Sequence, residues 1–309
     1  MIIGGRSEKC RQLAGLIKKS ANITLLIHRQ PDGDALGSAQ ALRLALGEKR
    51  VTLCCLDPLP AVFGAVLGEL SLSPTLPSES DLVIALDGAN AGRFGLLDRR
   101  LKGPLAVIDN HPPGTLDRRA TVVLRDLQAP ATATLIEGLL DQLRIPLTAE
   151  IAQALLLGLY CDTGGFRHPN TTGRSLKLVA KLLSCGGNLR VINQALESRM
   201  SVGVLKLWGQ VIDRLVINDL GMAVARVDRQ MLGPDQFAGA DFNGLSRQLL
   251  CQDVSSVSVL VEEDDGWSFK LKTVNPRADL RRLSLIFGGR STKTTFGFRA
   301  TNSRFPGII

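Results

Sequence analysis

The chain has 309 residues, of which 45% are hydrophobic and 21% charged, which is typical of a soluble globular protein long enough for two domains. Aromatic residues make up only 4%, which argues against a surface of stacked rings for long single-stranded nucleic acid. The formal net charge of +8 favours polyanionic partners, although mild basicity by itself is common.

Three features of the sequence predict a cytoplasmic protein with no membrane partner. The basic N-terminus contains no apolar stretch of the kind found in secretory signals. No apolar run approaches the roughly 20 residues that span a bilayer. No C-x-x-C pair occurs, so we expect free thiols in a reducing compartment; the cysteines are Cys10, Cys54, Cys55, Cys161, Cys185 and Cys251.

The first 190 residues alternate strand-like and helix-like segments. Short apolar runs with β-branched residues predict strands, and apolar residues at helical spacing predict a helix at Ala35–Leu46. The predicted strands are Ile23–His28, Val51–Leu56, Leu82–Asp87, Leu105–Asp109 and Thr121–Leu124. Apolar strands separated by helices are typical of an α/β fold whose parallel sheet has helices on both faces.

Helical periodicity dominates after residue 131, and a more mixed pattern follows it. The predicted helices are Ala131–Leu143, Ala149–Tyr160, Gly173–Leu183 and Leu189–Glu197, with a connection at Met200–Gln210. Later strands are predicted at Val211–Ile217, Met222–Val227, Ser256–Val261 and Trp267–Thr273, and helices near Phe242–Leu250 and Asp279–Phe287. We predict an α/β catalytic domain over residues 1–190, a helical linker over 191–212, and a smaller mixed α/β domain over 213–309.

Residue types that bind metals follow several of the predicted strands and one helix. They are His28, Asp32, Asp34, Asp87, Asp109, Asn110, His111 and Asp162. In an open parallel sheet, ligands gather outside the carboxyl ends of the strands, so we expect these side chains to converge on one crevice. Each motif alone also fits an ordinary turn or helix cap. His168 is expected to have a structural or substrate-lining role.

Converging carboxylates without cations would repel one another strongly. Bound divalent ions remove that repulsion, and a set of carboxylates and imidazoles suits Mn²⁺, Fe²⁺ or Zn²⁺ better than Ca²⁺. Two such ions about 3.5–4 Å apart can clamp a phosphoryl group and activate a water molecule. The residues therefore predict metal-assisted hydrolysis of a phosphate ester.

Three longer motifs and one strand-end aspartate are specific. The motifs are H-x-x-P-D-G-D-A-L-G-S-A at His28–Ala39, D-x-H-P at Asp109–Pro112 and G-x-Y-x-D-T-G-x-F at Gly158–Phe166, and Asp87 stands alone at its strand end. Together they resemble the DHH phosphoesterase family. Within it they are similar to the two-domain DHH/DHHA1 branch of oligoribonucleases (nanoRNases) and 3′-phosphoadenosine-5′-phosphate (pAp) phosphatases.

The resemblance implies a hydrolase for short RNA or nucleotides that uses two divalent metal ions, Mn²⁺ above all. One ion would be held by His28, Asp32 and Asp87. The second would be held by Asp34, Asp87 and Asp162, so that Asp87 bridges the pair. A homodimer is compatible with this resemblance, and the substrate is expected between the two domains.

The D-H-H motif of the family is altered in this chain. Asn110 replaces the first His, which is normally a ligand of the second metal. Because an Asn carbonyl oxygen is neutral and harder than imidazole, we expect a weaker second site. His111 matches the second His, which contacts the scissile phosphate and helps to protonate the leaving oxygen. Asp109 would support these groups through hydrogen bonds.

The C-terminal motif departs further from the family. Its usual G-G-G-H stretch corresponds here to Phe287–Phe298, which lacks the His but includes Lys293, a cation that could bind phosphate. The substrate-binding residues that the resemblance implies are Arg277, Gly288, Gly289 and Arg290. Plain divergence and a shifted reading frame near Arg290 would each account for the unusual tail at Ser291–Ile309.

Other functions remain open at this point. Within the same superfamily, the alternatives are a single-strand exonuclease, a cyclic-dinucleotide phosphodiesterase and a family II inorganic pyrophosphatase. The chain length argues against the large exonuclease, and the lack of sensor and membrane segments argues against the usual cyclic-dinucleotide enzymes. A non-catalytic nucleotide-binding protein is the alternative from another class, motivated by Asn110 and by the altered C-terminal stretch.

Overall fold

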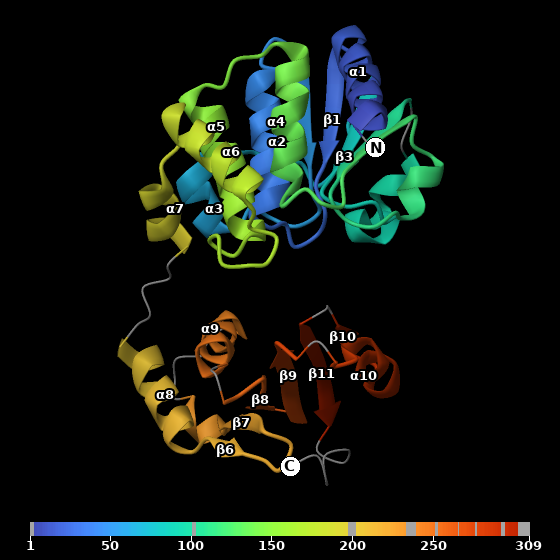
Figure 1. Ribbon diagram of the computed structural model, residues 1–309. Coiled ribbons are helices and arrows are strands. Elements are labelled where there is room, and N and C mark those ends of the chain that lie inside the picture. The colour runs from blue at the N-terminus through green and yellow to red at the C-terminus, as the bar shows by residue number, and fades with distance from the viewer. Residues whose placement is uncertain are drawn as a thin grey trace. The chain divides into compact units, whose positions relative to one another are not determined.

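The computed structural model describes residues 3–100, 103–196, 202–232, 239–250, 253–264, 266–275, 277–291 and 294–301. The chain forms two compact units, Met1–Ser198 and Arg199–Ile309, and each is described by itself (Figure 1). The division after Ser198 falls inside the range predicted as a linker. In the described part of the chain, no helix is both long and apolar enough to cross a membrane, and no disulfide joins the cysteines.

A five-stranded parallel sheet forms the centre of the first unit. Its strands are β1 (Asn22–Leu26), β2 (Arg50–Cys54), β3 (Leu82–Leu86), β4 (Leu105–Asp109) and β5 (Val122–Arg125). Their order is β2-β1-β3-β4-β5, and every pair is parallel. The chain therefore runs outward from β1 to one edge and then returns to place β3 on the other side of β1. The carboxyl ends of β1 and β3 flank this topological switch point, where α/β sheets bind ligands.

The helices of the first unit follow the apolar periodicity of the sequence. They are α1 (Ile3–Lys19), α2 (Gly33–Ala45), α3 (Ala61–Leu67), α4 (Thr132–Leu143), α5 (Ala149–Asp162), α6 (Gly173–Ser184) and α7 (Leu189–Leu196), with 3-10 helices η1 (Ala91–Arg100) and η2 (Thr115–Arg118). The sequence does not predict α1, α3, η1 or η2. It places α2, α4, α5, α6 and α7 within about two residues of their ends, the usual uncertainty of a boundary.

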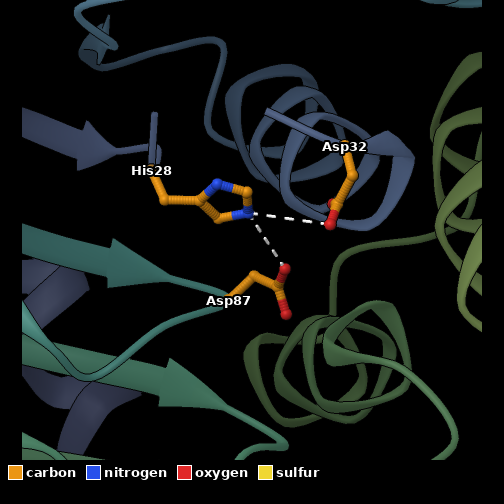
Figure 2. A group of neighbouring side chains, drawn as sticks. All are labelled: His28, Asp32 and Asp87. Carbon is orange, nitrogen blue, oxygen red and sulfur yellow. Dashed lines mark ion pairs between the residues drawn. The ribbon is translucent and has the colours of Figure 1, made fainter. Parts of the chain in front are cut away.

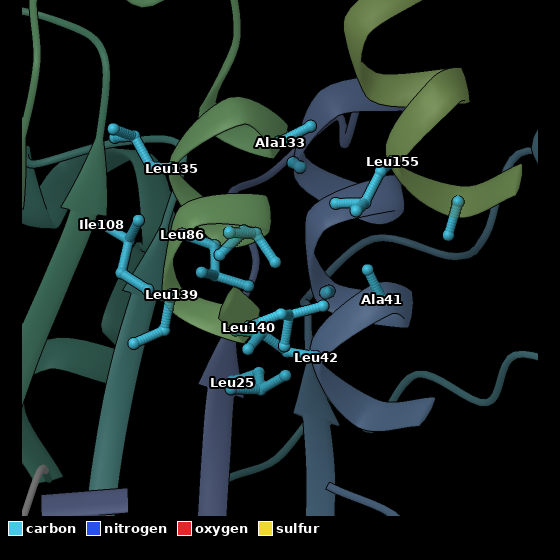
Figure 3. Packing of buried hydrophobic residues seen from close by; sticks show 14 of the residues in the cluster. Leu25, Ala41, Leu42, Leu86, Ile108, Ala133, Leu135, Leu139, Leu140 and Leu155 are labelled. Atoms are coloured by element: carbon cyan, nitrogen blue, oxygen red, sulfur yellow. The ribbon is translucent and has the colours of Figure 1, made fainter. Parts of the chain in front are cut away.

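Different helices pack against the two faces of the sheet. Leu25 and Ile108 lie in the main core with residues of α2, α4 and α5 (Figure 3). Leu13 and Ile17 of α1 belong to the same core. On the opposite face, Val83 packs with Phe94 of η1 and Leu116 of η2. Because side chains alternate along each buried strand, both faces are apolar. The charged side chains of the strands therefore lie at the strand ends.

Two glycines of the sequence motifs allow close approach around helix α5. A Cβ at Gly37 would collide with the carbonyl oxygen of Ala154 on α5. A Cβ at Gly158 would lie 2.6 Å from Oδ1 of Asp34. Any side chain at these positions would push α2 away from α5 or displace a carboxylate of the site. The motif glycines thus set the position of the site.

The second unit contains a mixed six-stranded sheet with helices. Its elements are α8 (Val202–Asp213), β6 (Val216–Ile217), β7 (Met222–Val227), η3 (Arg229–Met231), α9 (Gly239–Leu249), β8 (Ser256–Glu263), β9 (Gly266–Thr273), α10 (Leu280–Phe287), β10 (Arg290–Ser291) and β11 (Thr295–Thr301). The strand order is β10-β11-β9-β8-β7-β6, in which only β7 and β8 are parallel. This agrees with the predicted smaller mixed α/β domain.

One prediction in this region is wrong. Val211–Ile217 is a strand only at its last two residues, because α8 occupies Val202–Asp213. Leu207, Trp208 and Val211 recur at helical spacing and are buried together, so tertiary burial extends the helix through Asp213.

The tail of the chain contributes to this sheet as far as Thr301, and residues 302–309 lie outside the described part. Strand β11 pairs with β9 along its whole length. Phe296 and Phe298 of β11 lie against Phe269 of β9, with ring centroids 6.1 and 5.1 Å away. The first part of the tail therefore completes the second sheet and its core.

Candidate metal centre

His28 and Asp87 face each other across the topological switch point. His28 lies two residues beyond β1, and Asp87 directly follows β3. Figure 2 shows the imidazole directed at two carboxylates: His28 Nε2 is 3.4 Å from Oδ2 of Asp87 and 3.7 Å from Oδ2 of Asp32. These three residues form a group whose potential ligand atoms all lie within 4.8 Å of one another.

The hydrogen bonds of His28 suit a metal ligand. Its Nδ1 is 2.8 Å from the carbonyl oxygen of Arg29, so Nδ1 carries the proton and the lone pair of Nε2 points to the carboxylates. This Nε2 is buried and has no hydrogen-bond partner among the described residues. Burial lowers the pKa of His28, but the contact with Asp87 and the bond to Arg29 outweigh burial and raise it. The position therefore suits a cation.

Asp32 reaches this group because it also begins helix α2. Its Oδ1 accepts hydrogen bonds from the backbone N–H groups of Asp34 and Ala35, at 3.1 and 3.0 Å. This is the usual contact of a helix N-cap. Since one oxygen caps the helix, the other is left to face His28. The D-G-D motif thus combines a helix start with a potential ligand.

Asp87 is buried and has a constrained backbone conformation. It is 1% exposed, and its φ of +55° lies in the left-handed region, which Asp tolerates better than most residues. The guanidinium of Arg93 donates to its carbonyl oxygen at 3.1 Å, and the hydroxyl of Thr132 donates to its Oδ1 at 2.9 Å. Burial raises the pKa of Asp87 even though His28 lies nearby.

Asp34 is fully buried and binds the start of helix α4. Its Oδ2 accepts the backbone N–H of Thr132 at 2.6 Å, and its Oδ1 accepts that of Ala133 at 3.0 Å. Oδ1 also accepts the hydroxyl of Ser38 at 3.4 Å. Oδ2 keeps a further lone pair, so these bonds still allow contact with a cation. Burial and the charges of Asp87 and Asp162 raise the pKa of Asp34 well above its usual range.

Asp162 lies at the end of α5, beside the altered position of the D-H-H motif. The amide nitrogen of Asn110 is 3.4 Å from Oδ2 of Asp162 and 3.4 Å from the carbonyl oxygen of Ala129. Its amide oxygen is 3.1 Å from the hydroxyl of Thr132. The donor end of Asn110 therefore faces Asp162. Burial, followed by the charges of Asp87 and Asp32, raises the pKa of Asp162 to about 7.

His111 stands at the edge of the carboxylate group, with 47% of its side chain exposed. Its Nδ1 is 2.9 Å from Oδ1 of Asp109 and 3.5 Å from Oδ1 of Asp87. Arg125 donates to Oδ2 of Asp109 at 3.4 Å and is itself held by Asp117 at 2.6 Å. The bond to Asp109 raises the pKa of His111 against the effect of burial. His111 is thus poised to carry a proton at an exposed position.

The structure brings some of the predicted ligand residues of the first unit into close groups and leaves others outside these groups. Among the described His, Cys, Asp and Glu side chains, two groups have ligand atoms within 4.8 Å: His28, Asp32 and Asp87, and Asp87, Asp109 and His111. Asp34 and Asp162 belong to neither group, although their charges act on each other. Their ligand roles stay predictions.

His168 supports the loop that carries Asp162. Its Nδ1 is 3.2 Å from the carbonyl oxygen of Asp162, and the amide of Asn170 donates to the same oxygen at 3.2 Å and to that of Pro130 at 3.0 Å. Sequence reasoning overlooked Asn170, and it also overlooked Thr132 and Arg125. No local pattern identifies them, because their partners lie 8 to 98 residues away along the chain.

The glycine pair of the second unit has structural contacts of its own. Gly288 ends helix α10 with a φ of +71°, and a Cβ at Gly289 would lie 2.8 Å from that of Phe298 on β11. Arg277 is exposed. The side chain of Arg290 and the whole of Lys293 lie outside the described residues. The role of this segment in substrate binding stays a prediction.

We expect the metal-free protein to lose stability as the pH rises from about 5.5 to about 8. The pKa values of Asp34, Asp87 and Asp162 are raised, so the folded chain holds protons that the unfolded chain releases above its ordinary pKa of 3.8. The raised pKa values of His28 and His111 act in the same direction above 6.5. Stability is therefore lost as the pH rises through the folded pKa values.

The measurement is a series of thermal melts in EDTA and in Mn²⁺. Because a metal competes with these protons, the rise in Tm on adding Mn²⁺ should be larger at about pH 8 than at about pH 5.5. A Tm in EDTA that increases across this interval would contradict the assignment of the raised groups.

Comparisons with known proteins agree with this geometry. The model of the DHH family N-terminal domain matches residues 22–159. The chain is 32% identical over 290 residues to the bifunctional oligoribonuclease and PAP phosphatase NrnA of Thermus thermophilus, covering 91% of this chain and 85% of that protein. It is 26% identical to NrnA of Bacillus subtilis, over 82% of each chain. An exopolyphosphatase-related protein from Bacteroides fragilis has the same fold, with a TM-score of 0.83 at 21% identity over 98% of this chain and 92% of that one.

Proposed function

The chain belongs to the DHH family, and from this membership we propose that it is a metal-dependent phosphoesterase that hydrolyses short oligoribonucleotides, pAp, or both. The relative from Thermus thermophilus carries both activities in its name and aligns over most of its length. The observation that carries the proposal is the buried, unpartnered Nε2 of His28 between Asp32 and Asp87. Such a nitrogen among carboxylates is the environment that a divalent cation requires.

Two divalent ions, Mn²⁺ by preference, would occupy the centre. His28, Asp32 and Asp87 would hold the first, and Asp34, Asp87 and Asp162 the second. Asn110 would add its amide oxygen to the second only if its amide turned, because its nitrogen now faces Asp162. When bound, the ions supply Lewis-acid activation of water and neutralise charge on the phosphoryl oxygens.

The residues of the chain itself would supply the proton for the leaving oxygen. His111 is exposed enough to meet a substrate, and its bond to Asp109 leaves Nε2 as the nitrogen that can face it. Arg125 donates a hydrogen bond to the second carboxylate oxygen of Asp109. This bond fixes the carboxylate and therefore the orientation of the His111 imidazole. Protonation of the leaving oxygen by a positioned imidazole is ordinary general acid catalysis. Arg277, Gly288, Gly289 and Arg290 of the second unit would contact the substrate.

The test is to compare turnover of a ribodinucleotide, pAp, a cyclic dinucleotide and pyrophosphate in Mn²⁺. The ribodinucleotide or pAp should be hydrolysed fastest, and removal of metal by EDTA should stop the reaction. Preferred turnover of the cyclic dinucleotide or pyrophosphate would assign the chain to another activity of the superfamily.

A non-catalytic nucleotide-binding protein is the second candidate, because the donor end of Asn110 opposes a cation at Asp162. Restoring the imidazole with Asn110→His separates the two. An enzyme with a weakened second site should gain roughly 10- to 100-fold in metal affinity or activity. Stoichiometric nucleotide binding without turnover, in both the wild type and this variant, would favour the binder.

A further inference from the structure

Thr132 contacts three members of the site, although it belongs to none of the sequence motifs. It is the first residue of helix α4 and is fully buried. Its backbone N–H donates to Asp34 at 2.6 Å. Its hydroxyl lies 2.9 Å from Oδ1 of Asp87 and 3.1 Å from Oδ1 of Asn110. One residue thus joins a carboxylate from α2 to groups at the ends of β3 and β4.

We propose that Thr132 is a positioning residue whose hydroxyl fixes the rotation of the Asp87 carboxylate for cation binding. The proposal rests on the metal-dependent function given above. A carboxylate turns readily about its last torsion, and only a bound partner fixes which oxygen faces which neighbour. The bond from Thr132 holds Oδ1, and this leaves Oδ2 on the side of His28.

The competition for the hydroxyl proton favours Asp87. The hydroxyl has one proton and two acceptors within reach, Asp87 and Asn110. A bond to an ionised carboxylate is roughly twice as strong as one to a neutral amide, so the proton goes mainly to Asp87. His111 does not replace this bond, because its Nδ1 is closer to Asp109, at 2.9 Å, than to Asp87, at 3.5 Å.

The same helix offers a matched control. Thr134 is also buried on α4, but its hydroxyl has no hydrogen-bond partner among the described residues. Thr132→Val and Thr134→Val each replace a hydroxyl by a methyl group of the same shape, and both keep the backbone N–H groups. If the hydroxyl of Thr132 serves only packing, the two variants should behave alike. Thr132→Ser retains the hydroxyl and should restore the function.

The experiment measures Mn²⁺ binding by calorimetry and by the EPR signal of free Mn²⁺, with circular dichroism as a check of folding. Thr132→Val should lower Mn²⁺ affinity about 10- to 100-fold, and it should lower kcat more than it raises KM. Thr132→Ser should stay close to the wild type, as should Thr134→Val. In an Asn110→His background the loss from Thr132→Val should persist, because the hydroxyl acts through Asp87.

Two outcomes would overturn the assignment of Thr132: unchanged Mn²⁺ affinity in a folded Thr132→Val variant, or disappearance of its effect in the Asn110→His background. Both require that the wild type binds Mn²⁺. If the wild type itself binds no divalent metal and turns over no phosphate ester, the proposed function fails, and that result is distinguishable from a failure of the positioning role.

Discussion

Replacing Asp87 by Asn should reduce kcat/KM at least about 10³-fold, equivalent to about 4 kcal/mol of transition-state stabilisation. In the proposed centre Asp87 is the ligand that both cation positions share, so its loss would weaken both positions at once. Asn is the informative replacement because it tolerates the left-handed backbone, with φ at +55°. Its amide can still accept the bond from Thr132. Activity should therefore fall through charge rather than through misfolding.

The same substitution should stabilise the metal-free protein. Asp87 is buried among carboxylates, and its charge contributes to the raised pKa values of Asp34 and Asp162. Removing one negative charge relieves this repulsion, and the Tm in EDTA should rise by a few degrees for each kcal/mol gained. For Asp87→Asn, the Tm measured in EDTA should therefore rise while the turnover measured in Mn²⁺ falls.

Asp81, just before the other end of the same strand, provides the control. Its Oδ2 accepts the backbone N–H groups of Ala21 and Asn22, at 2.9 and 2.7 Å, and these bonds lower the pKa of Asp81. Asp81→Asn should therefore keep normal turnover and lower the Tm. If Asp87→Asn retained wild-type turnover, or destabilised the metal-free chain as Asp81→Asn does, the shared role of Asp87 would be wrong.

The sequence predicts those parts of the site in which a potential ligand residue directly follows a strand. Five strands were identifiable because each is a short apolar run, and in a parallel sheet their carboxyl ends share one edge. His28 and Asp87 follow neighbouring strands for this reason. The sequence does not predict helix α1, although Leu13 and Ile17 are buried at helical spacing, because charged residues interrupt the apolar pattern of the N-terminus.

The rest depends on contacts between residues distant in the chain. Helix α4 has no side-chain cap of its own at Ala131; instead Asp34, 98 residues away along the chain, accepts its first free N–H group. Likewise the hydroxyl of Thr132 meets Asp87 across 45 residues. The orientation of the Asn110 amide follows from three neighbours that surround it only in the fold. Local propensity contains no information about such contacts.

His111→Gln should reduce turnover of a ribodinucleotide about 10²- to 10⁴-fold. The leaving group of this substrate is an alkoxide, which needs a proton as the bond to phosphorus breaks. Gln keeps a polar group of similar length but cannot transfer a proton. The loss should be much smaller for a p-nitrophenyl ester of a nucleoside 5′-phosphate, because its phenolate leaves without protonation. The measurement is therefore kcat on both substrates with saturating Mn²⁺.

The difference between the two substrates separates proton transfer from the other roles open to His111. Its Nδ1 is 3.5 Å from Oδ1 of Asp87, so an equal loss on both esters would indicate that it supports the metal centre or binds phosphate instead. Asp109→Asn also tests proton transfer by His111, since it removes the charge that orients the imidazole. It should give a smaller loss with the same dependence on the leaving group, because a general acid held less firmly is still a general acid.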